Sequence, residues 1–152
     1  MENKETHRLA AIVFTDIVGY TSQMDANETR TLKILKRQRE VVFPIVEEHN
    51  GKVLKEMGDG LLMMFDSAIQ AVECAIAFQG KLQEEEFSLR AGIHIGDVVI
   101  SGQDVFGSAV NIAARLEPLA RPNGICISED VRNQVRNRMD VILKPSGKRE
   151  LK

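Results

Sequence analysis

The chain has 152 residues, of which 43% are apolar and 28% charged, a composition typical of one soluble globular domain and not of a disordered chain. Its formal net charge of −2, without a long basic stretch, gives no reason to expect a nucleic-acid binder, although it does not exclude a local basic patch. The longest apolar runs, Leu9–Phe14 and Leu61–Phe65, are far too short to cross a bilayer, and the charged start of the chain is unlike a signal or transit peptide.

The first quarter of the sequence predicts a buried strand followed by a long helix. The strand covers Leu9–Ile17, which is apolar and β-branched, and it ends at Gly19. Helical periodicity then runs from about Asn27 to Glu48, with Pro44 expected to kink or divide the helix. The apolar stripe of this helix comprises Leu32, Leu35, Val42, Ile45 and Val46.

A hairpin and a second helix are predicted next. Two short strands, Lys52–Met57 and Leu61–Phe65, are joined by Gly58-Asp59-Gly60, in which the glycines allow a tight turn around one exposed carboxylate. Asp66 or Ser67 would cap the helix that follows. Its expected core face consists of Ile69, Val72, Ala75, Ile76 and Leu82.

The second half begins with a long strand, Phe87–Ile100, interrupted by Gly92 and Gly96. The expected later elements are a helix over Ser108–Leu119, a strand over Gly124–Ser128, a helix over Glu129–Asn137 and a strand fragment over Val141–Leu143. The order β-α-β-β-α-β predicts an α+β, ferredoxin-like fold with additional C-terminal α and β elements. We expect a single domain over residues 1–152 that belongs to a longer protein, because a new strand begins where the sequence stops.

Three residues that often carry chemistry have simpler interpretations. Cys74 and Cys126 are far apart and outside any Cys-x-x-Cys pattern, so we expect buried reduced thiols in a cytosolic protein. His94 lies between two isoleucines on the long strand, and nothing marks it as a ligand. A structural role is expected for all three residues.

Two aspartates, Asp16 and Asp59, lie on turns that follow or join apolar strands. Taken alone, each is more simply a turn or helix-cap residue. Neighbouring strands of one sheet would bring the two carboxylates together, however, and Mg²⁺ binds through a few carboxylates together with substrate phosphates. Gly19 would let backbone N–H groups at the start of a helix approach phosphate oxygens. The pair therefore predicts a site for divalent metal ions and a phosphate chain.

Four segments carry a family resemblance: Phe14–Thr21, Lys55–Gly60, Gly92–Gly96 and Asp104–Glu117. In this order and at these spacings they resemble the catalytic domain of class III adenylyl and guanylyl cyclases of the bacterial type. The resemblance extends from about residue 8 to residue 152, nearly the whole chain. It implies the cyclase homology fold and an adenylyl cyclase that converts ATP into 3′,5′-cyclic AMP and pyrophosphate.

The resemblance also implies a role for each matching position. Asp16 and Asp59, with the carbonyl of Ile17, resemble the ligands of two Mg²⁺ or Mn²⁺ ions. Asn111 resembles the amide that orients the ribose, and Arg115 resembles the arginine that stabilises the transition state. Their spacing would place both on one helical face. Substrate contacts are expected at Lys55, Asp104, Gly19, Tyr20 and Thr21.

Lys55 and Asp104 occupy the positions that read the purine in this family. A lysine donor and an aspartate acceptor complement the adenine edge, whereas guanylyl cyclases typically have Glu in place of Lys55. Glu56 is one position away and should face the other side of the strand. ATP is therefore the expected substrate; the alternative interpretation of Lys55 is an ordinary exposed lysine.

In this family the active sites lie at a head-to-tail dimer interface, with the metal-binding aspartates from one subunit and the base, ribose and transition-state residues from the other. This chain carries both sets, so the resemblance implies a homodimer with two equivalent sites. The segment Gly96–Asp104 is shorter than the mammalian pattern, which implies a reduced dimerisation arm. The triphosphate-binding lysine would be Lys152 or lie beyond it, with Lys144 and Lys148 as nearby candidates.

Other functions remain open at this stage. One is a guanylyl or relaxed-specificity cyclase, and another is a cyclase-like domain that binds nucleotide or a partner without turnover. A ferredoxin-like RNA binder is disfavoured, because the chain has one Tyr and no aromatic motif for a sheet surface. We expect a cytoplasmic location, or the cytosolic part of a membrane-attached protein. A regulatory or sensor domain would lie elsewhere in a longer chain, and this segment would contact neither nucleic acid nor membrane.

Overall fold

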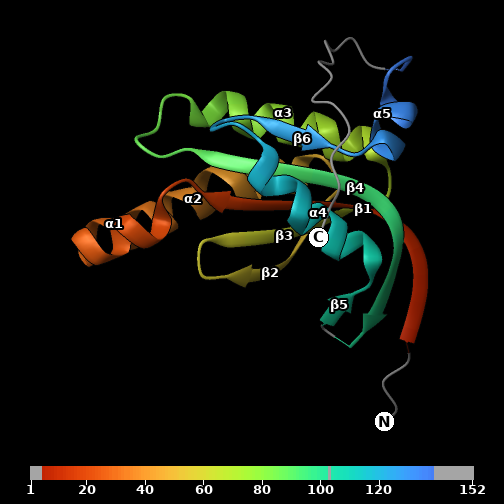
Figure 1. Cartoon of the computed structure of the whole chain (residues 1–152), viewed down its shortest axis with the longest axis horizontal. Helices are drawn as coiled ribbons and strands as arrows, with labels where there is room; N and C mark the ends of the chain where they lie inside the picture. Colours follow the sequence, from red (N-terminus) through yellow and green to blue (C-terminus); the bar gives the residue numbers. More distant parts are fainter. Residues whose placement is uncertain (1–4, 103, 139–152) are drawn as a thin grey trace.

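The computed structural model describes residues 5–102 and 104–138, with the backbone alone for residues 23–25. A six-stranded sheet carries helices on both faces (Figure 1). The first elements are β1 (Glu5–Ile17), α1 (Tyr20–Ala26), α2 (Glu28–Glu48), β2 (Lys52–Met57), β3 (Gly60–Phe65) and α3 (Ala68–Leu82). They are followed by β4 (Leu89–Ser101), β5 (Asp104–Phe106), α4 (Ser108–Leu116), the 3-10 helix η1 (Glu117–Leu119), β6 (Ile125–Ile127) and α5 (Glu129–Val135). The predicted ferredoxin-like order with additional C-terminal elements is confirmed.

The sheet has the order β2-β3-β1-β4-β5, with β6 pairing in parallel with β4. Strand β1 is antiparallel to both β3 and β4, and its ladder with β4 runs from Glu5 opposite Ser101 to Ile17 opposite Leu89. Because pairing with β4 satisfies the backbone of the polar residues before Leu9, β1 begins earlier than its apolar pattern predicted.

The two faces of the sheet bury separate hydrophobic cores. Ala11 and Val13 of β1 pack in the larger core, together with residues of α2 and α3. Ala10 and Ile12 face the other side and pack in a smaller core with α4. This alternation along one strand is what a sheet covered on both faces requires. Of the residues expected to be functional, Asn111 and Arg115 lie on α4 itself, whereas Ile17 and Tyr20 pack with the larger core.

Two predicted core positions are wrong. Leu32 of α2 is 54% exposed and Ile76 of α3 is 44% exposed. Leu32 lies near the start of α2, the end that adjoins α1 and extends beyond the sheet (Figure 1). On α3 the buried stripe passes through Val72, Ala75 and Phe78, which leaves Ile76 at its edge.

Side-chain caps mark the starts of α2 and α3, and the second of them had been predicted at Asp66 or Ser67. The side chain of Asn27 accepts a hydrogen bond from Arg30 N at 3.0 Å, and Ser67, not Asp66, caps α3 by accepting from Gln70 N at 3.1 Å. Pro44 lies inside α2 and does not divide it.

Strand β4 is continuous, in contrast to the predicted interruptions at Gly92 and Gly96. A Cβ on Gly92 would lie 2.5 Å from both Ala113 O and Glu117 N. The absence of a side chain at Gly92 therefore allows the backbone at the end of α4 to pack directly against the sheet. The short strand β5 was not predicted. The expected strand Val141–Leu143 falls outside the described residues.

The two cysteines differ in environment. Cys74 is fully buried, and this burial raises the pKa of its thiol to about 12, as expected for an inert structural cysteine. Cys126 is only half-buried, so the expectation of two buried thiols is wrong for this residue. None of the helices in the described ranges has the length and apolar character needed to cross a membrane.

Candidate active site

Asp16 and Asp59, the aspartate pair, are brought together by strand pairing. Asp16 lies near the end of β1, which is antiparallel to β3, and Asp59 is in the β2–β3 turn next to β3. Gly58 before it has a φ of +63°, which provides the left-handed backbone predicted for this turn. Oδ2 of Asp59 accepts a hydrogen bond from Ile17 N at 2.8 Å, so the turn is attached to the end of β1.

The electrostatics of Asp59 reflect a carboxylate close to a like charge. Burial raises the pKa of Asp59 above its ordinary value, and the nearby Asp16 carboxylate raises it further. Hydrogen bonds from the backbone N–H groups of Ile17 and of Asp59 itself act in the opposite direction. A cation between the two carboxylates would relieve their repulsion.

The donor set fits a divalent metal ion. Oδ1 of Asp16 is buried without a hydrogen-bond donor among the described residues, an arrangement that is costly unless something else satisfies the oxygen. Oxygen ligands of this kind suit Mg²⁺ or Mn²⁺. In the described part of the chain, no group of three or more His, Cys, Asp and Glu side chains could hold a metal by itself. A metal here would therefore need ligands besides these side chains, such as backbone carbonyls, water or substrate.

The chain turns directly after Asp16 and Ile17. Gly19 has a φ of +70°, and α1 begins at Tyr20. The predicted helix start after Asp16 is thus present, with Thr21 in its first turn. Exposed backbone N–H groups at such a turn are suited to phosphate oxygens.

Lys55 and Asp104, here called the edge pair, meet across the sheet. They lie on β2 and β5, the strands at opposite ends of the order, yet Lys55 Nζ is 3.0 Å from Asp104 Oδ1. The sheet therefore curls around α4 and the smaller core, and β2 and β5 lie on the same side of the molecule in Figure 1. A register shift between Val53 and Lys55 accompanies this geometry.

The edge pair has defined hydrogen-bonding capacity. Oδ1 of Asp104 accepts from Lys55 and also from Val105 N at 2.9 Å, and the bond from Lys55 lowers the pKa of Asp104 most. Lys55 retains two further N–H donors, and Asp104 retains a second oxygen. Glu56 instead bonds Arg39 of α2, so it faces away from Asp104 as predicted. Both members of the pair remain exposed, with side-chain exposures of 46% and 58%.

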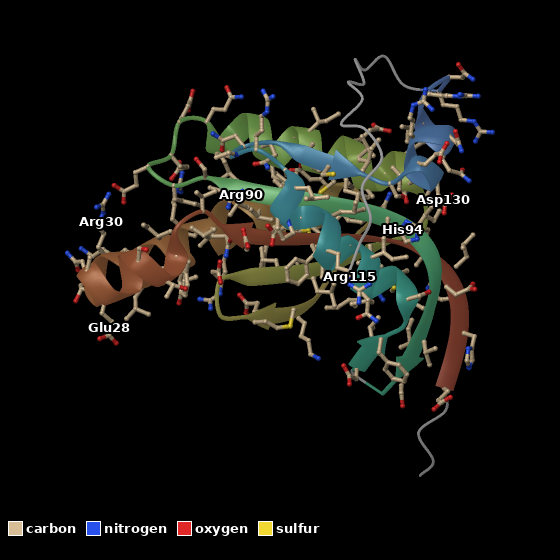
Figure 2. All side chains as sticks on the ribbon, in the orientation of Figure 1. Glu28, Arg30, Arg90, His94, Arg115 and Asp130 are labelled. Atoms are coloured by element: carbon tan, nitrogen blue, oxygen red, sulfur yellow. The ribbon has the colours of Figure 1, made fainter. Side chains whose placement is uncertain are left out.

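Asn111 and Arg115 lie on α4 and are exposed. Figure 2 shows Arg115 on α4, separate from Arg90 on β4. Within the described ranges, neither side chain forms a hydrogen bond or ion pair with the aspartate pair or with the edge pair. One chain thus contains the aspartate pair and the edge pair as two local groups, while Asn111 and Arg115 of α4 are exposed to solvent. The sequence positions of the candidate triphosphate lysines, Lys144, Lys148 and Lys152, fall outside the described residues.

The sequence reasoning missed Glu117 and Arg90, which adjoin the aspartate pair. Glu117 is only 2% exposed at the start of η1, and its carboxyl lies close to that of Asp16. Burial first, and then the contact with Asp16, raises the pKa of Glu117 well above its ordinary value, while Arg90 acts in the opposite direction. Arg90 lies opposite Asp16 in the β1–β4 ladder, and its Nε donates to Ala120 O at 3.1 Å.

A signal for Glu117 was present in the sequence but was weak. A glutamate after an amphipathic helix is normally solvated, so Glu117 received no role. Gly92 inside a predicted central strand was the stronger indication, because such a glycine often marks close approach of another backbone. His94 has the expected structural contact: its Nδ1 lies 2.8 Å from Oγ of Ser128, the N-cap of α5, and Asp130 lies nearby (Figure 2).

Comparison with known proteins identifies relatives over nearly the whole chain. Residues 2–152 match the family model described as the adenylate and guanylate cyclase catalytic domain. A putative adenylate cyclase of Rhizobium meliloti is 41% identical over 154 aligned residues, which cover 95% of this chain and 26% of that protein. An adenylate cyclase of Streptomyces coelicolor is 32% identical, with 79% and 32% of the two chains covered. The chain thus spans about a quarter to a third of the length of these relatives.

Solved structures agree in fold. The crystal structure of an adenylate/guanylate cyclase/hydrolase from Silicibacter pomeroyi superposes with a TM-score of 0.92 at 36% identity, covering 98% of this chain and 92% of that one. The guanylyl cyclase Cya2 superposes with a TM-score of 0.80 at 24% identity, over 99% and 90% of the two chains.

Proposed function

This chain belongs to the family of adenylate and guanylate cyclase catalytic domains, and we propose that it is an adenylyl cyclase that converts ATP into 3′,5′-cyclic AMP and pyrophosphate. The observation that carries the choice of ATP is the edge pair. Lys55 and Asp104 are joined at 3.0 Å, and together they offer free donors beside a free acceptor. The adenine edge presents the complementary acceptor N1 and donor N6, whereas guanine presents the reverse order.

At the other end of the substrate, Asp16 and Asp59 would hold two Mg²⁺ or Mn²⁺ ions, with the carbonyl of Ile17 as an additional ligand. Bound metal would neutralise phosphate charge and lower the pKa of the ribose 3′-hydroxyl. The proposal is supported by the buried, donor-free Oδ1 of Asp16 and by the mutual repulsion of the two carboxylates. Backbone N–H groups of Gly19, Tyr20 and Thr21 would bind the phosphate oxygens.

Asn111 and Arg115 would act on the reacting atoms. The 3′-oxygen attacks the α-phosphorus and pyrophosphate leaves, so the nucleophile must be aligned and charge at phosphorus stabilised. Asn111 would orient the ribose, and the permanent positive charge of Arg115 would stabilise the transition state. Arg90, which lies opposite Asp16 in the β1–β4 ladder, would add a further cation near the phosphate chain.

We propose that each site is shared between two copies of the chain in a head-to-tail homodimer. One copy would supply Asp16 and Asp59, and the other Lys55, Asp104, Asn111 and Arg115. Among the described residues, no hydrogen bond or ion pair joins the aspartate pair to the edge pair or to the side chains of α4, which supports this division. The exposure of the edge pair, which a partner would cover, supports it as well. Two identical chains related by a two-fold axis would form two equivalent sites.

A complementation assay tests this proposal. Asp16→Asn and Arg115→Ala should each abolish formation of cyclic AMP from ATP and Mn²⁺, because each disables both sites of its homodimer. After mixing and exchange, half of the dimers are mixed and each has one intact site, so activity should return to about one quarter of wild type. Recovery below a few per cent, with subunit exchange verified by mass spectrometry, would refute the shared site. If the wild-type protein forms no cyclic nucleotide, the proposed enzymatic activity is refuted.

Two other functions are alternatives. The family includes guanylate as well as adenylate cyclase catalytic domains, so GTP is the alternative substrate, and a direct comparison of ATP and GTP turnover decides between them. A domain that binds nucleotide without turnover would show binding in calorimetry but no product with either Mg²⁺ or Mn²⁺.

We further propose that this domain is the catalytic part of a longer cytoplasmic or membrane-attached protein, with a regulatory or sensor domain elsewhere in the chain. The small share of each relative that it spans supports this arrangement. The proposed use of ATP and the free, buried thiol of Cys74 are consistent with the cytoplasm.

A further inference from the structure

Gln79 of α3 is a buried amide whose presence in the core has a cost. Its side chain is 4% exposed, and its Oε1 is buried without a donor from any described residue. An apolar side chain of similar size would avoid that cost, because a buried polar atom is unfavourable unless it is hydrogen-bonded. The reason for a glutamine at this position must therefore lie in the contacts of its other polar atom, Nε2.

Nε2 of Gln79 links two segments that are far apart in the sequence. It donates to Leu89 O at 3.0 Å, at the start of β4, and to Gly124 O at 2.9 Å, just before β6. Leu89 O also accepts from Asn123 N at 2.8 Å. Gly124 O also accepts from Ala91 N at 3.2 Å. Since each carbonyl already has a backbone donor, Gln79 is not needed to satisfy either of them, and it acts as an additional clamp between the two segments.

Arg90 lies between the two segments that Gln79 clamps. The Leu89 carbonyl belongs to the peptide bond between Leu89 and Arg90, so the amide of Gln79 helps to orient the backbone at Arg90. Leu89 and Ala91 pack in the larger core, and alternation along β4 places the Arg90 side chain on the opposite face of the sheet. On that face Arg90 Nε donates to Ala120 O at 3.1 Å, in the loop between η1 and β6. Gln79 and Arg90 thus join the same two segments from opposite faces.

The guanidinium of Arg90 keeps most of its donors for a ligand. Arg90 is half-buried and lies opposite Asp16 in the β1–β4 ladder, and such cross-strand partners project from the same face of a sheet. Among the described residues, nothing forms a hydrogen bond or ion pair with its two Nη groups. A planar guanidinium held at Nε presents its remaining N–H groups as a fork, which suits phosphate oxygens.

We propose that Gln79 is a positioning residue for binding of the nucleotide's triphosphate chain, and that it acts through Arg90. Its two hydrogen bonds hold the start of β4 against the loop before β6, so that the Arg90 guanidinium is directed at phosphate oxygens bound beside Asp16. The inference rests on the proposed function, which places the phosphate chain there. Gln79 itself lies on the other face of the sheet and touches neither substrate nor metal. Misplacement of a functional group by about 1 Å, caused by a distant mutation, can cost roughly 100-fold in rate.

The test compares a ligand that has the triphosphate with one that lacks it. Calorimetry of the whole chain with Mn²⁺ measures the affinity for 3′-deoxy-ATP, which cannot cyclise, and for 3′-deoxyadenosine. Gln79→Leu and Gln79→Met both approximate the volume of glutamine and remove its two hydrogen bonds, so one serves if the other does not fold. Arg90→Ala and the double variant with Gln79→Leu complete the set. Gln38→Leu is the matched control, because Gln38 is a buried glutamine of α2 whose side chain makes no hydrogen bond within the described ranges.

We expect Gln79→Leu to weaken binding of 3′-deoxy-ATP by roughly 3–30-fold and to leave binding of 3′-deoxyadenosine unchanged, because only the phosphates depend on Arg90. The double variant should bind 3′-deoxy-ATP no more weakly than Arg90→Ala, since Gln79 would act through a group that is already absent. Gln38→Leu should bind both ligands like the wild type. Unchanged binding of 3′-deoxy-ATP by Gln79→Leu would overturn the inference. Equal weakening of both ligands, or additive losses in the double variant, would overturn it as well, because these results indicate a general structural role.

The outcome is separable from the proposed function. If Arg90→Ala binds 3′-deoxy-ATP as tightly as the wild type, the inference about Gln79 fails, whereas formation of cyclic AMP from ATP by the wild type still supports the cyclase. If the wild type binds 3′-deoxy-ATP but forms no cyclic nucleotide from ATP, the proposed activity fails, and the comparison of the Gln79 and Arg90 variants still decides the inference.

Discussion

The closest backbone approach in the site provides a quantitative test. In Gly92→Ala the new Cβ would lie 2.5 Å from Ala113 O, 2.5 Å from Glu117 N and 2.9 Å from Glu117 Cα. All three atoms are backbone, so no change of rotamer relieves the clash and α4 or η1 must move. Overpacking of this kind costs about 1–3 kcal/mol, and we expect the upper part of that range, with a melting temperature lower by roughly 5–10 °C.

Gly80→Ala is the matched control, because it introduces the same methyl group where nothing lies within 4 Å. Gly80 is in the last turns of α3, so this variant should be stabilised, by about 0.5–1 kcal/mol at most. Urea unfolding followed by circular dichroism, at one fixed protein concentration because association contributes to stability, measures both changes. An unchanged urea midpoint for Gly92→Ala would refute the packing argument.

Two further predictions concern base preference and the core thiol. Lys55→Glu combined with Asp104→Ser should raise the ratio of GTP to ATP turnover by roughly 10–100-fold, because the hydrogen-bonding pattern offered to the base is reversed. The control variant Glu56→Gln should leave this ratio unchanged. A constant ratio in the double variant would show that Lys55 and Asp104 do not read the base. Because burial raises the pKa of Cys74 from 9.0 to about 12, its folded thiol should stay protonated and resist iodoacetamide near pH 9 until urea unfolds the chain. Rapid labelling of the native protein at pH 9, read by mass spectrometry, would contradict the expected protonation of this thiol. The same pKa shift means that the contribution of the protonated thiol to the free energy of unfolding, intact below pH 9, is lost as the pH rises toward 12.

The sequence was informative where a local rule acts alone. Turn glycines and the capping of α3 by Ser67 depend on near neighbours in the chain, and these predictions were confirmed. The sequence could not reveal the contact between Lys55 and Asp104 by pattern alone, because it depends on how far the sheet curls around α4. The family resemblance, and not periodicity, brought these two residues together. Glu117 was missed for the same reason, because its burial at the start of η1 depends on Gly92 of β4, which is distant in the sequence.

The exposure of the edge pair links substrate selection to dimer formation. Hydrogen bonds discriminate strongly between bases only where a mismatched group is left without water, since the penalty arises from buried groups that remain unpaired. In one chain the side chains of Lys55 and Asp104 are 46% and 58% exposed, so water could replace either contact with a wrong base at little cost. Discrimination of adenine from guanine by this pair therefore requires a second surface that excludes water from it. On the proposed division of the site, that surface is the partner that brings the aspartate pair and the phosphate-binding turn. Selectivity and catalysis would then arise in the same step, when two half-sites close on one nucleotide.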